Sequence, residues 1–346
     1  MDRLEWAAPM PMTLTICETG AVKIFGDVAP QVVPPTLAYL DMNKWVELAQ
    51  WRVAGDPAKD QKRFHTALDW ATSGQVLFPL SSAHFFEIAK IGDDKRRRSL
   101  ASAMADLSQG WFLVSPSNLI NNELRRVMAH KFHRPVSIAP PCPITRSIAL
   151  VFAERGQIDL THEDRLFRQP GFLEEFLATA RVDRPFLNNW SRIAEEHEHS
   201  RGITWGGSKV QRKRAYCARL TIGISDAFGV SLSEVGMTSA DLEKLGPDGC
   251  VQLLEGVPFF DIEVFLHVER NEHRDRGIQA NDEIDIGFLR MAVPYCDYVI
   301  TEKFWANLLC RGHFDKKYTT TIGSSLSAAL ACLAAQVSGN QETSLR

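Results

Sequence analysis

Short apolar segments that alternate with helical patterns occupy both ends of this chain, and a long, mostly helical stretch separates them. The first apolar segment is Leu37–Leu40. Others follow at 76–80 and 111–114, and the pattern resumes at 298–300 and 319–322. Strands separated by helices are typical of βα units, whose strands pair in parallel. We therefore expect an α/β fold with a central, mostly parallel sheet, interrupted by a long helical insertion.

This pattern divides the chain into five segments. An N-terminal extension, 1–30, has a predicted strand pair within 12–27. The α/β unit is predicted in two parts, 31–133 and 280–338, on either side of the mostly helical insertion at 134–279. The last residues, 339–346, are predicted to form a flexible tail.

Charge and cysteine content narrow the class of protein. The formal net charge is −3, so any contact with nucleic acid has to come from a local basic patch. The seven cysteines include no CxxC pair and have no regular spacing, which favours reduced thiols. The N-terminus lacks a signal-peptide layout, and no apolar run reaches the roughly 20 residues of a membrane span. We expect a cytoplasmic protein without a membrane segment.

Common catalytic motifs are absent from the sequence. It contains no GxxxxGK[ST], no GxGxxG after a strand, no GxSxG and no HExxH. The histidines of Glu195–His199 stand two apart and do not share a helix face, so we predict a solvated polar segment there. His130 and His133 do share a face, but nothing nearby completes a ligand set, which favours a structural or surface role.

Carboxylates at strand ends and helix starts are the remaining candidates. Asp41 directly follows Leu37–Leu40, where the ligand crevice of an open α/β sheet lies, although Asp41 or Asn43 could simply cap the next helix. Glu87 lies in an apolar helical turn, where a carboxylate is costly without a partner. An exposed pair with Lys90 is the alternative.

A second group of acids lies near the C-terminus. Asp282 and Asp285 are three residues apart in the first turn of a predicted helix, where they could favour the helix dipole or share a divalent cation. The next predicted strand is preceded by Asp297 and followed by Thr301 and Glu302.

This order of sites resembles the PIN-like nuclease superfamily. Its domains usually have Asp-x-Asn or Asp-x-Ser after the first strand, a Glu on an early helix, an Asp opening a late helix, and Thr-x-Asp or Thr-Asp after the next strand. The resemblance covers roughly 36–132 and 280–337, and it implies a three-layer fold. Two features depart from the family pattern. Glu302 stands where Asp is more common, so that Asp297 could share its role, and the 134–279 segment is far longer than in a compact PIN toxin.

The resemblance and the residue types imply the same chemistry. Carboxylates without convergent His or Cys suit Mg²⁺ or Mn²⁺, which can activate water for attack on a phosphodiester. Asp41 and Asp285 are the expected direct ligands, and Glu87 would join them as a ligand or act as a base through water. Asp282 would be a ligand or a base acting through water, Glu302 completes the catalytic acids, and Asn43, Thr301 and Asp297 would orient them.

An RNA substrate also requires cations. Between Ser200 and Ser225 the chain has basic residues and no acidic ones, with two aromatic side chains among them. This composition is typical of a segment that follows phosphates and stacks bases, and an exposed basic helix face is the alternative. The expected RNA contacts are Lys209, Arg212, Lys213, Arg214 and Trp205.

The leading hypothesis is a metal-dependent PIN-like endoribonuclease that acts on single-stranded or structured RNA. Toxin and defence roles are common in the superfamily, and an inhibitor or antitoxin protein would be the corresponding partner. The alternative is a catalytically inactive PIN-like module that binds RNA or protein, which Glu302 in place of Asp would favour. A different Mg²⁺ phosphohydrolase is a third hypothesis, but Asp41-Met42-Asn43 lacks the second Asp of an aspartyl-phosphate motif.

Overall fold

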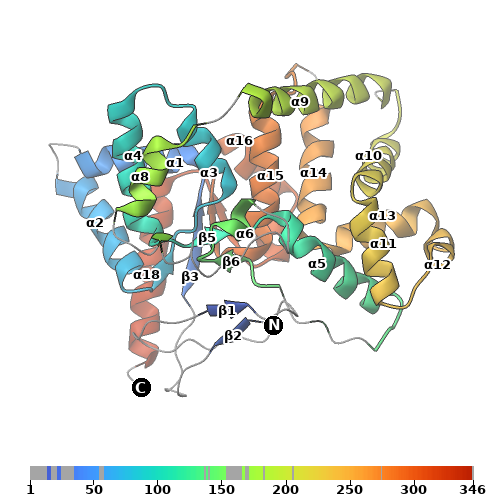
Figure 1. The fold of residues 1–346 in the computed structure, drawn as a ribbon, viewed down its shortest axis with the longest axis horizontal. Helices are drawn as coiled ribbons and strands as arrows, with labels where there is room; N and C mark the ends of the chain where they lie inside the picture. Colours follow the sequence, from blue (N-terminus) through green and yellow to red (C-terminus); the bar gives the residue numbers. More distant parts are fainter. Residues whose placement is uncertain are drawn as a thin grey trace.

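The computed structural model describes residues 14–16, 22–24, 35–53, 58–135, 138, 141–152, 166–167, 171–181, 184–204, 206–273 and 275–344. It is a mixed α/β structure, mostly helical, with a small parallel sheet of four strands (Figure 1). Among these residues, no helix combines the length and the apolarity needed to cross a bilayer.

The central sheet has the order β4-β3-β7-β8, with all neighbours parallel. Its strands are β3 (Thr36–Leu40), β4 (Val76–Leu77), β7 (Tyr298–Ile300) and β8 (Thr321–Gly323). The two central strands come from opposite ends of the chain, with Leu40 opposite Ile300. The two predicted parts of the α/β unit therefore pair with each other at the centre of one sheet.

The sheet continues beyond β4 through one parallel bridge between Leu80 and Phe112. Phe112 belongs to β5 (Phe112–Leu113), which pairs antiparallel with β6 (Ile144–Thr145). A separate antiparallel pair, β1 (Leu14–Ile16) and β2 (Val22–Ile24), forms within the predicted 12–27 pair. The residues between these two strands lie outside the described part of the chain.

Helices cover both faces of the sheet because its strand residues are buried alternately on the two sides. On one face Ala38, Leu40 and Ile300 pack into a core with α1 (Met42–Val53), α2 (Ala58–Thr72), α4 (Asp94–Ser108), α8 (Phe172–Thr179) and α18 (Leu326–Ser344). On the other face Tyr39 and Val299 pack against α14 (Pro258–Glu272), α15 (Ala280–Tyr295), α16 (Lys303–Arg311) and α17 (Phe314–Lys317).

A third apolar core lies among the helices beyond the sheet (Figure 1). It combines α5 (Pro116–Lys131), α10 (Lys209–Gly223), α11 (Ser225–Glu234), α13 (Gly246–Gly256) and one side of α14. The remaining helices are α3 (Ser82–Ala89), α6 (Ala149–Phe152), α9 (Arg184–Thr204) and α12 (Ser239–Glu243).

Two predicted boundaries differ from the structure. The predicted flexible tail begins at 339, but α18 continues through Ser344, because adding a residue to a formed helix costs far less than starting one. The 134–279 segment also contributes to the main unit, since α8 packs on α4 and α14 packs on α15.

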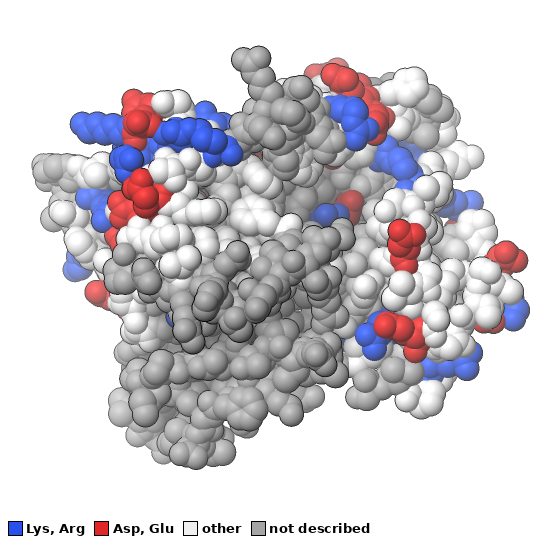
Figure 2. All heavy atoms as spheres, viewed as in Figure 1, with Lys and Arg blue, Asp and Glu red and all other residues white. Residues whose placement is uncertain are grey.

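Charged side chains of both signs are intermixed on the face shown in Figure 2, where lysine and arginine lie beside aspartate and glutamate over α4, α8 and α9. The described part of this face has no continuous basic stripe. This distribution agrees with the small net charge of the chain.

Candidate functional site

The carboxyl ends of β3 and β7 form the crevice where the candidate site lies. The connection from β3 to β4 runs through α1 and α2 on one face of the sheet, whereas β7 connects to β8 through α16 on the other. Such a reversal opens a crevice between the two strands, which is the usual ligand position in open α/β sheets. Asp41 and Thr301 follow these strands directly, and the Asp41 amide donates to the Ile300 carbonyl over 2.9 Å.

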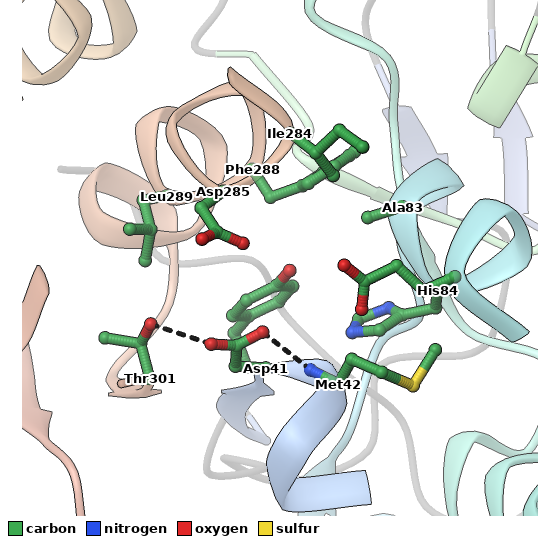
Figure 3. Close-up of a pocket in the computed structure, with 11 residues that line it drawn as sticks. Asp41, Met42, Ala83, His84, Ile284, Asp285, Phe288, Leu289 and Thr301 are labelled. Carbon is green, nitrogen blue, oxygen red and sulfur yellow. Dashed lines mark hydrogen bonds between the residues drawn. The ribbon is translucent and has the colours of Figure 1, made fainter. Parts of the chain in front are cut away.

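Three of the predicted acids line one small cavity at this crevice. Asp41 from the end of β3, Glu87 from α3 and Asp285 from α15 face a space of about 10 Å³. Figure 3 shows the Asp41 and Asp285 carboxylates pointing toward one another across this cavity. The space is about that needed for one water molecule, so a single ion would fit. Apolar side chains complete the walls: Met42, Ala83, Ile284, Phe288 and Leu289.

Hydrogen bonds fix the orientation of two of these acids. The Thr301 hydroxyl donates to Asp41 Oδ2 over 3.0 Å, and the Met42 amide donates to Asp41 Oδ1 over 2.7 Å (Figure 3). The Trp305 indole donates to Asp285 Oδ2 over 2.9 Å. Thr301 therefore contacts Asp41, one of the carboxylates that it was predicted to orient, while Trp305 is a contact that the sequence analysis did not identify.

Burial makes the charged forms of these acids unfavourable. It raises the pKa of Asp285 to about 8, with the Asp41 charge as the next cause. Burial and then Asp41 likewise raise the pKa of Glu87 to about 7, and burial is the main cause that raises the pKa of Asp41. A cation in the cavity would reverse this effect by favouring the ionised carboxylates.

His84 positions the two elements that hold Asp41 and Glu87. Its Nδ1 accepts from the Ser81 amide over 2.8 Å, so Nε2 carries the proton and donates to the Leu40 carbonyl over 2.8 Å. Burial lowers its pKa to about 4, which keeps the ring neutral. The histidine thereby ties the first turn of α3 to the last residue of β3.

The structure does not bring every predicted acid into the cavity. Glu302 is exposed beside it and accepts from Asn43 Nδ2 over 2.7 Å. Asp282 is buried, but it accepts from the Gln279 amide over 3.1 Å and pairs with Arg276, which places it outside the cavity lining. Asp297 precedes β7, so it lies at the opposite end of the strand, where it accepts from the Leu37 amide over 2.7 Å.

The predicted RNA contacts are distributed along α10, and each described one faces a carboxylate. Lys209 pairs with Glu269, Arg212 with Glu272, and Lys213 with Glu255. Arg214 pairs with Asp248 over 2.7 Å. Trp205 lies outside the described residues.

A second group of ligand-type side chains lies among α9, α14 and α15. Ligand atoms of His197, His267 and Glu283 all lie within 4.8 Å of one another, so this group could hold a metal ion. The sequence analysis expected a solvated polar segment at Glu195–His199. Glu195, Glu196 and His199 are exposed as expected, but His197 is only partly exposed, and its Nδ1 lies 2.7 Å from the Oε1 atom of buried Glu283. The two residues are 86 positions apart, and no local pattern links them.

No family model, curated protein or solved structure matches the chain.

Proposed function

We propose that this protein is a metal-dependent PIN-like nuclease that hydrolyses phosphodiester bonds in RNA. The observation that carries the proposal is the shared ion-sized cavity of Asp41, Glu87 and Asp285. The strand order supports it: with the Leu80–Phe112 bridge, the parallel strands follow the order β5-β4-β3-β7-β8, with the acids at the central reversal. The helical covers on both faces agree with a three-layer α/β fold.

The donor set of the cavity fits a hard divalent cation. Three carboxylates from different elements offer oxygen ligands, and no histidine nitrogen is free there, because both ring nitrogens of His84 are engaged with backbone groups. Oxygen-only sites suit Mg²⁺ or Mn²⁺ better than zinc. When bound, such an ion would lower the pKa of water and offset charge on the phosphate.

The residues of the chain supply orientation and proton exchange. Thr301 and the Met42 amide each hold one oxygen of Asp41, and Trp305 holds one oxygen of Asp285, so both carboxylates are fixed in orientation. Glu87 receives no side-chain hydrogen bond among the described residues, so its carboxylate is available to bind the ion or to take up a proton through water. Glu302 and Asn43 lie at the exposed rim, where they could contact the substrate.

The decisive experiment measures cleavage of a labelled single-stranded RNA with Mn²⁺. Asp41→Asn and Asp285→Asn should each lower the rate at least about 100-fold, since each removes a ligand charge and keeps the side-chain shape. Asp297→Asn is the matched control. It changes the same chemical group at the opposite end of the sheet and should retain cleavage.

The exposed position of Glu302 favours one alternative, a PIN-like module that binds RNA or protein without cleaving it. Wild-type protein that binds RNA with Mn²⁺ but cuts no member of a broad RNA panel would support this module and overturn the nuclease. If the protein neither binds nor cuts RNA, the proposal that it acts on nucleic acid is wrong.

A further inference from the structure

A second cavity, separate from the acidic one, is lined by arginines from three helices. It has a volume of about 180 Å³, and α9, α10 and α14 supply its walls. Its charged lining consists of Arg201, Arg212, Arg219 and Arg270, and no aspartate or glutamate lines it. Two histidines, His197 and His267, and the ring of Tyr216 also contribute.

Carboxylates hold three of these guanidinium groups in place from behind the cavity lining. Arg201 pairs with Glu198, Arg212 with Glu272, and Arg270 Nη1 donates to Glu283 Oε1 over 2.7 Å. For Arg219, no described carboxylate forms an ion pair. Its guanidinium lies 5.1 Å from the centre of the Tyr216 ring and donates to Ser200 over 3.3 Å. The four arginines thus carry one more positive charge than the three carboxylates paired with them can neutralise.

The hydrogen bonds of His267 argue against a metal ion in this cavity. Arg270 can only donate, so its contact of 3.1 Å makes His267 Nδ1 an acceptor and leaves the ring proton on Nε2. Both nitrogens of His267 are then unsuited to coordinate a cation. Glu283 Oε1 already accepts from Arg270 and His197, and the surrounding guanidinium groups would repel a divalent ion.

We propose that this cavity binds the phosphate group of a phosphomonoester. A phosphate dianion accepts several charge-assisted hydrogen bonds at once, and the planar guanidinium group matches two of its oxygens. Arg270 is buried, so its guanidinium is a charged group held in the cavity wall away from bulk solvent. The volume exceeds the space for a few waters but is below the usual ~300 Å³ for drug-sized ligands. The cavity can therefore enclose a phosphate and a small attached group, and the rest of a larger ligand would lie outside it.

The proposal is independent of the nuclease proposal, since it concerns binding alone at another cavity. α15 is the structural link between the two places: it carries Asp285 in the acidic cavity and Glu283 behind the arginines. The test is therefore made without divalent metal, where cleavage cannot contribute.

The test measures binding of inorganic phosphate and of adenosine 5′-monophosphate by calorimetry and by the shift in melting temperature. Arg219→Gln should raise the dissociation constant about tenfold or more, because it removes the cation that no carboxylate balances. Arg219→Lys should restore part of the affinity. Arg192→Gln is the matched control on α9, which also supplies a wall of the cavity. Arg192 pairs with Glu196, lies outside the cavity lining and should be replaceable without effect.

The source of the phosphate is distinguished by a pair of short RNAs that differ only in a 5′-phosphate or a 5′-hydroxyl. Stronger binding of the phosphorylated RNA than of the free nucleotide would identify an RNA end as the ligand, and the reverse would identify a small molecule. The proposal is overturned if neither phosphate nor nucleotide binds, or if Arg219→Gln and Arg192→Gln weaken binding equally. It is also overturned if Zn²⁺ or Mn²⁺ alone stabilises the protein through His197, with no response to phosphate.

Discussion

At the scale of single residues, burial is the largest cause of the raised pKa values in the acidic cavity, ahead of repulsion between the acids. The apolar side chains of Ile284, Phe288 and Leu289 line the same cavity, so the carboxyl groups have little water around them. The Trp305 indole opposes this effect at Asp285, because it donates to the ionised carboxylate. The cavity therefore destabilises the metal-free protein whenever its acids are ionised, which makes it responsive to cations.

The metal-free protein should lose stability as the pH rises from about 5 to about 8. The folded pKa values, about 7 for Glu87 and about 8 for Asp285, exceed the ordinary values of 4.5 and 3.8, so the folded state holds more protons in this window. Asp285→Asn removes one such group and should make the metal-free protein more stable than wild type at pH 8.5, by on the order of 1–3 kcal/mol. Urea unfolding of both proteins at pH 5 and pH 8.5 measures the difference, and parallel losses of stability would contradict the expected linkage.

Millimolar Mg²⁺ or Mn²⁺ should offset this loss in the wild-type protein. An ion that binds only the folded state stabilises it by mass action, and the gain should be greatest at pH 8.5, where protons no longer compete for the carboxylates. Asp285→Asn should respond much less. A melting temperature that neither ion changes at any pH would contradict the proposed metal site.

At the scale of elements, His84 joins α3 to β3 through two backbone hydrogen bonds, so the relative positions of Asp41 and Glu87 depend on it. The side chain is fully buried and neutral. It is therefore a positioning residue, and neither of its ring nitrogens is available to bind the metal ion. Its neighbours Trp45 and Tyr39 pack against its ring, which limits any rearrangement.

His84→Leu should destabilise the protein by about 2–4 kcal/mol, because the Leu40 carbonyl and the Ser81 amide would lose buried partners. At a temperature where the variant stays folded, it should also need more Mn²⁺ than wild type for half-maximal stabilisation, since Glu87 and Asp41 would no longer be held together. Leu48→Ala in the same apolar core is the control for a purely structural loss. Equal Mn²⁺ requirements in the two variants would exclude the positioning role.

The two central strands were predictable from the sequence because they are short and apolar and contribute to the cores on both faces of the sheet, as at Leu37–Leu40 and Tyr298–Ile300. The two-residue strand β6 lies in the segment predicted to be mostly helical and was missed. The meeting of Asp41, Glu87 and Asp285 was predicted from their places at strand ends and on helices together with the resemblance to PIN-like nucleases. Asp297 precedes its strand, which already places it at the opposite end of the sheet from Asp41. Asp282 and Asp285 are three residues apart, and only the packed structure shows that Asp282 pairs with Arg276 while Asp285 faces the cavity. The arginine cavity was not predicted for the same reason: its lining comes from three separate helices, α9, α10 and α14, which only the folded structure brings together.

At the scale of the whole molecule, the 134–279 segment completes the cores of the α/β unit. Ile262 and Leu266 of α14 are fully buried in the core on one face of the sheet, and Leu173 and Leu177 of α8 are buried in the core on the other. Each such side chain contributes about 1.5–3 kcal/mol through burial. The segment is an insertion in the order of the sequence, but it supplies part of both covers of the sheet.

Removal of residues 134–279 with a short flexible linker should therefore abolish cooperative folding. Loss of the four side chains named above alone would cost several kcal/mol, which is comparable with the whole stability of an ordinary domain, about 5–15 kcal/mol. It would also expose Ile286 and Leu289 of α15, which are buried against α14 and its neighbours. The measurement is a thermal melt followed by near-ultraviolet circular dichroism, which reports fixed tertiary packing. The full chain should show a sharp transition and the shortened chain none. A shortened chain that melts cooperatively and still gains stability from Mn²⁺ would show that the α/β unit folds without the segment, and the segment would then be a separable addition to the acidic site.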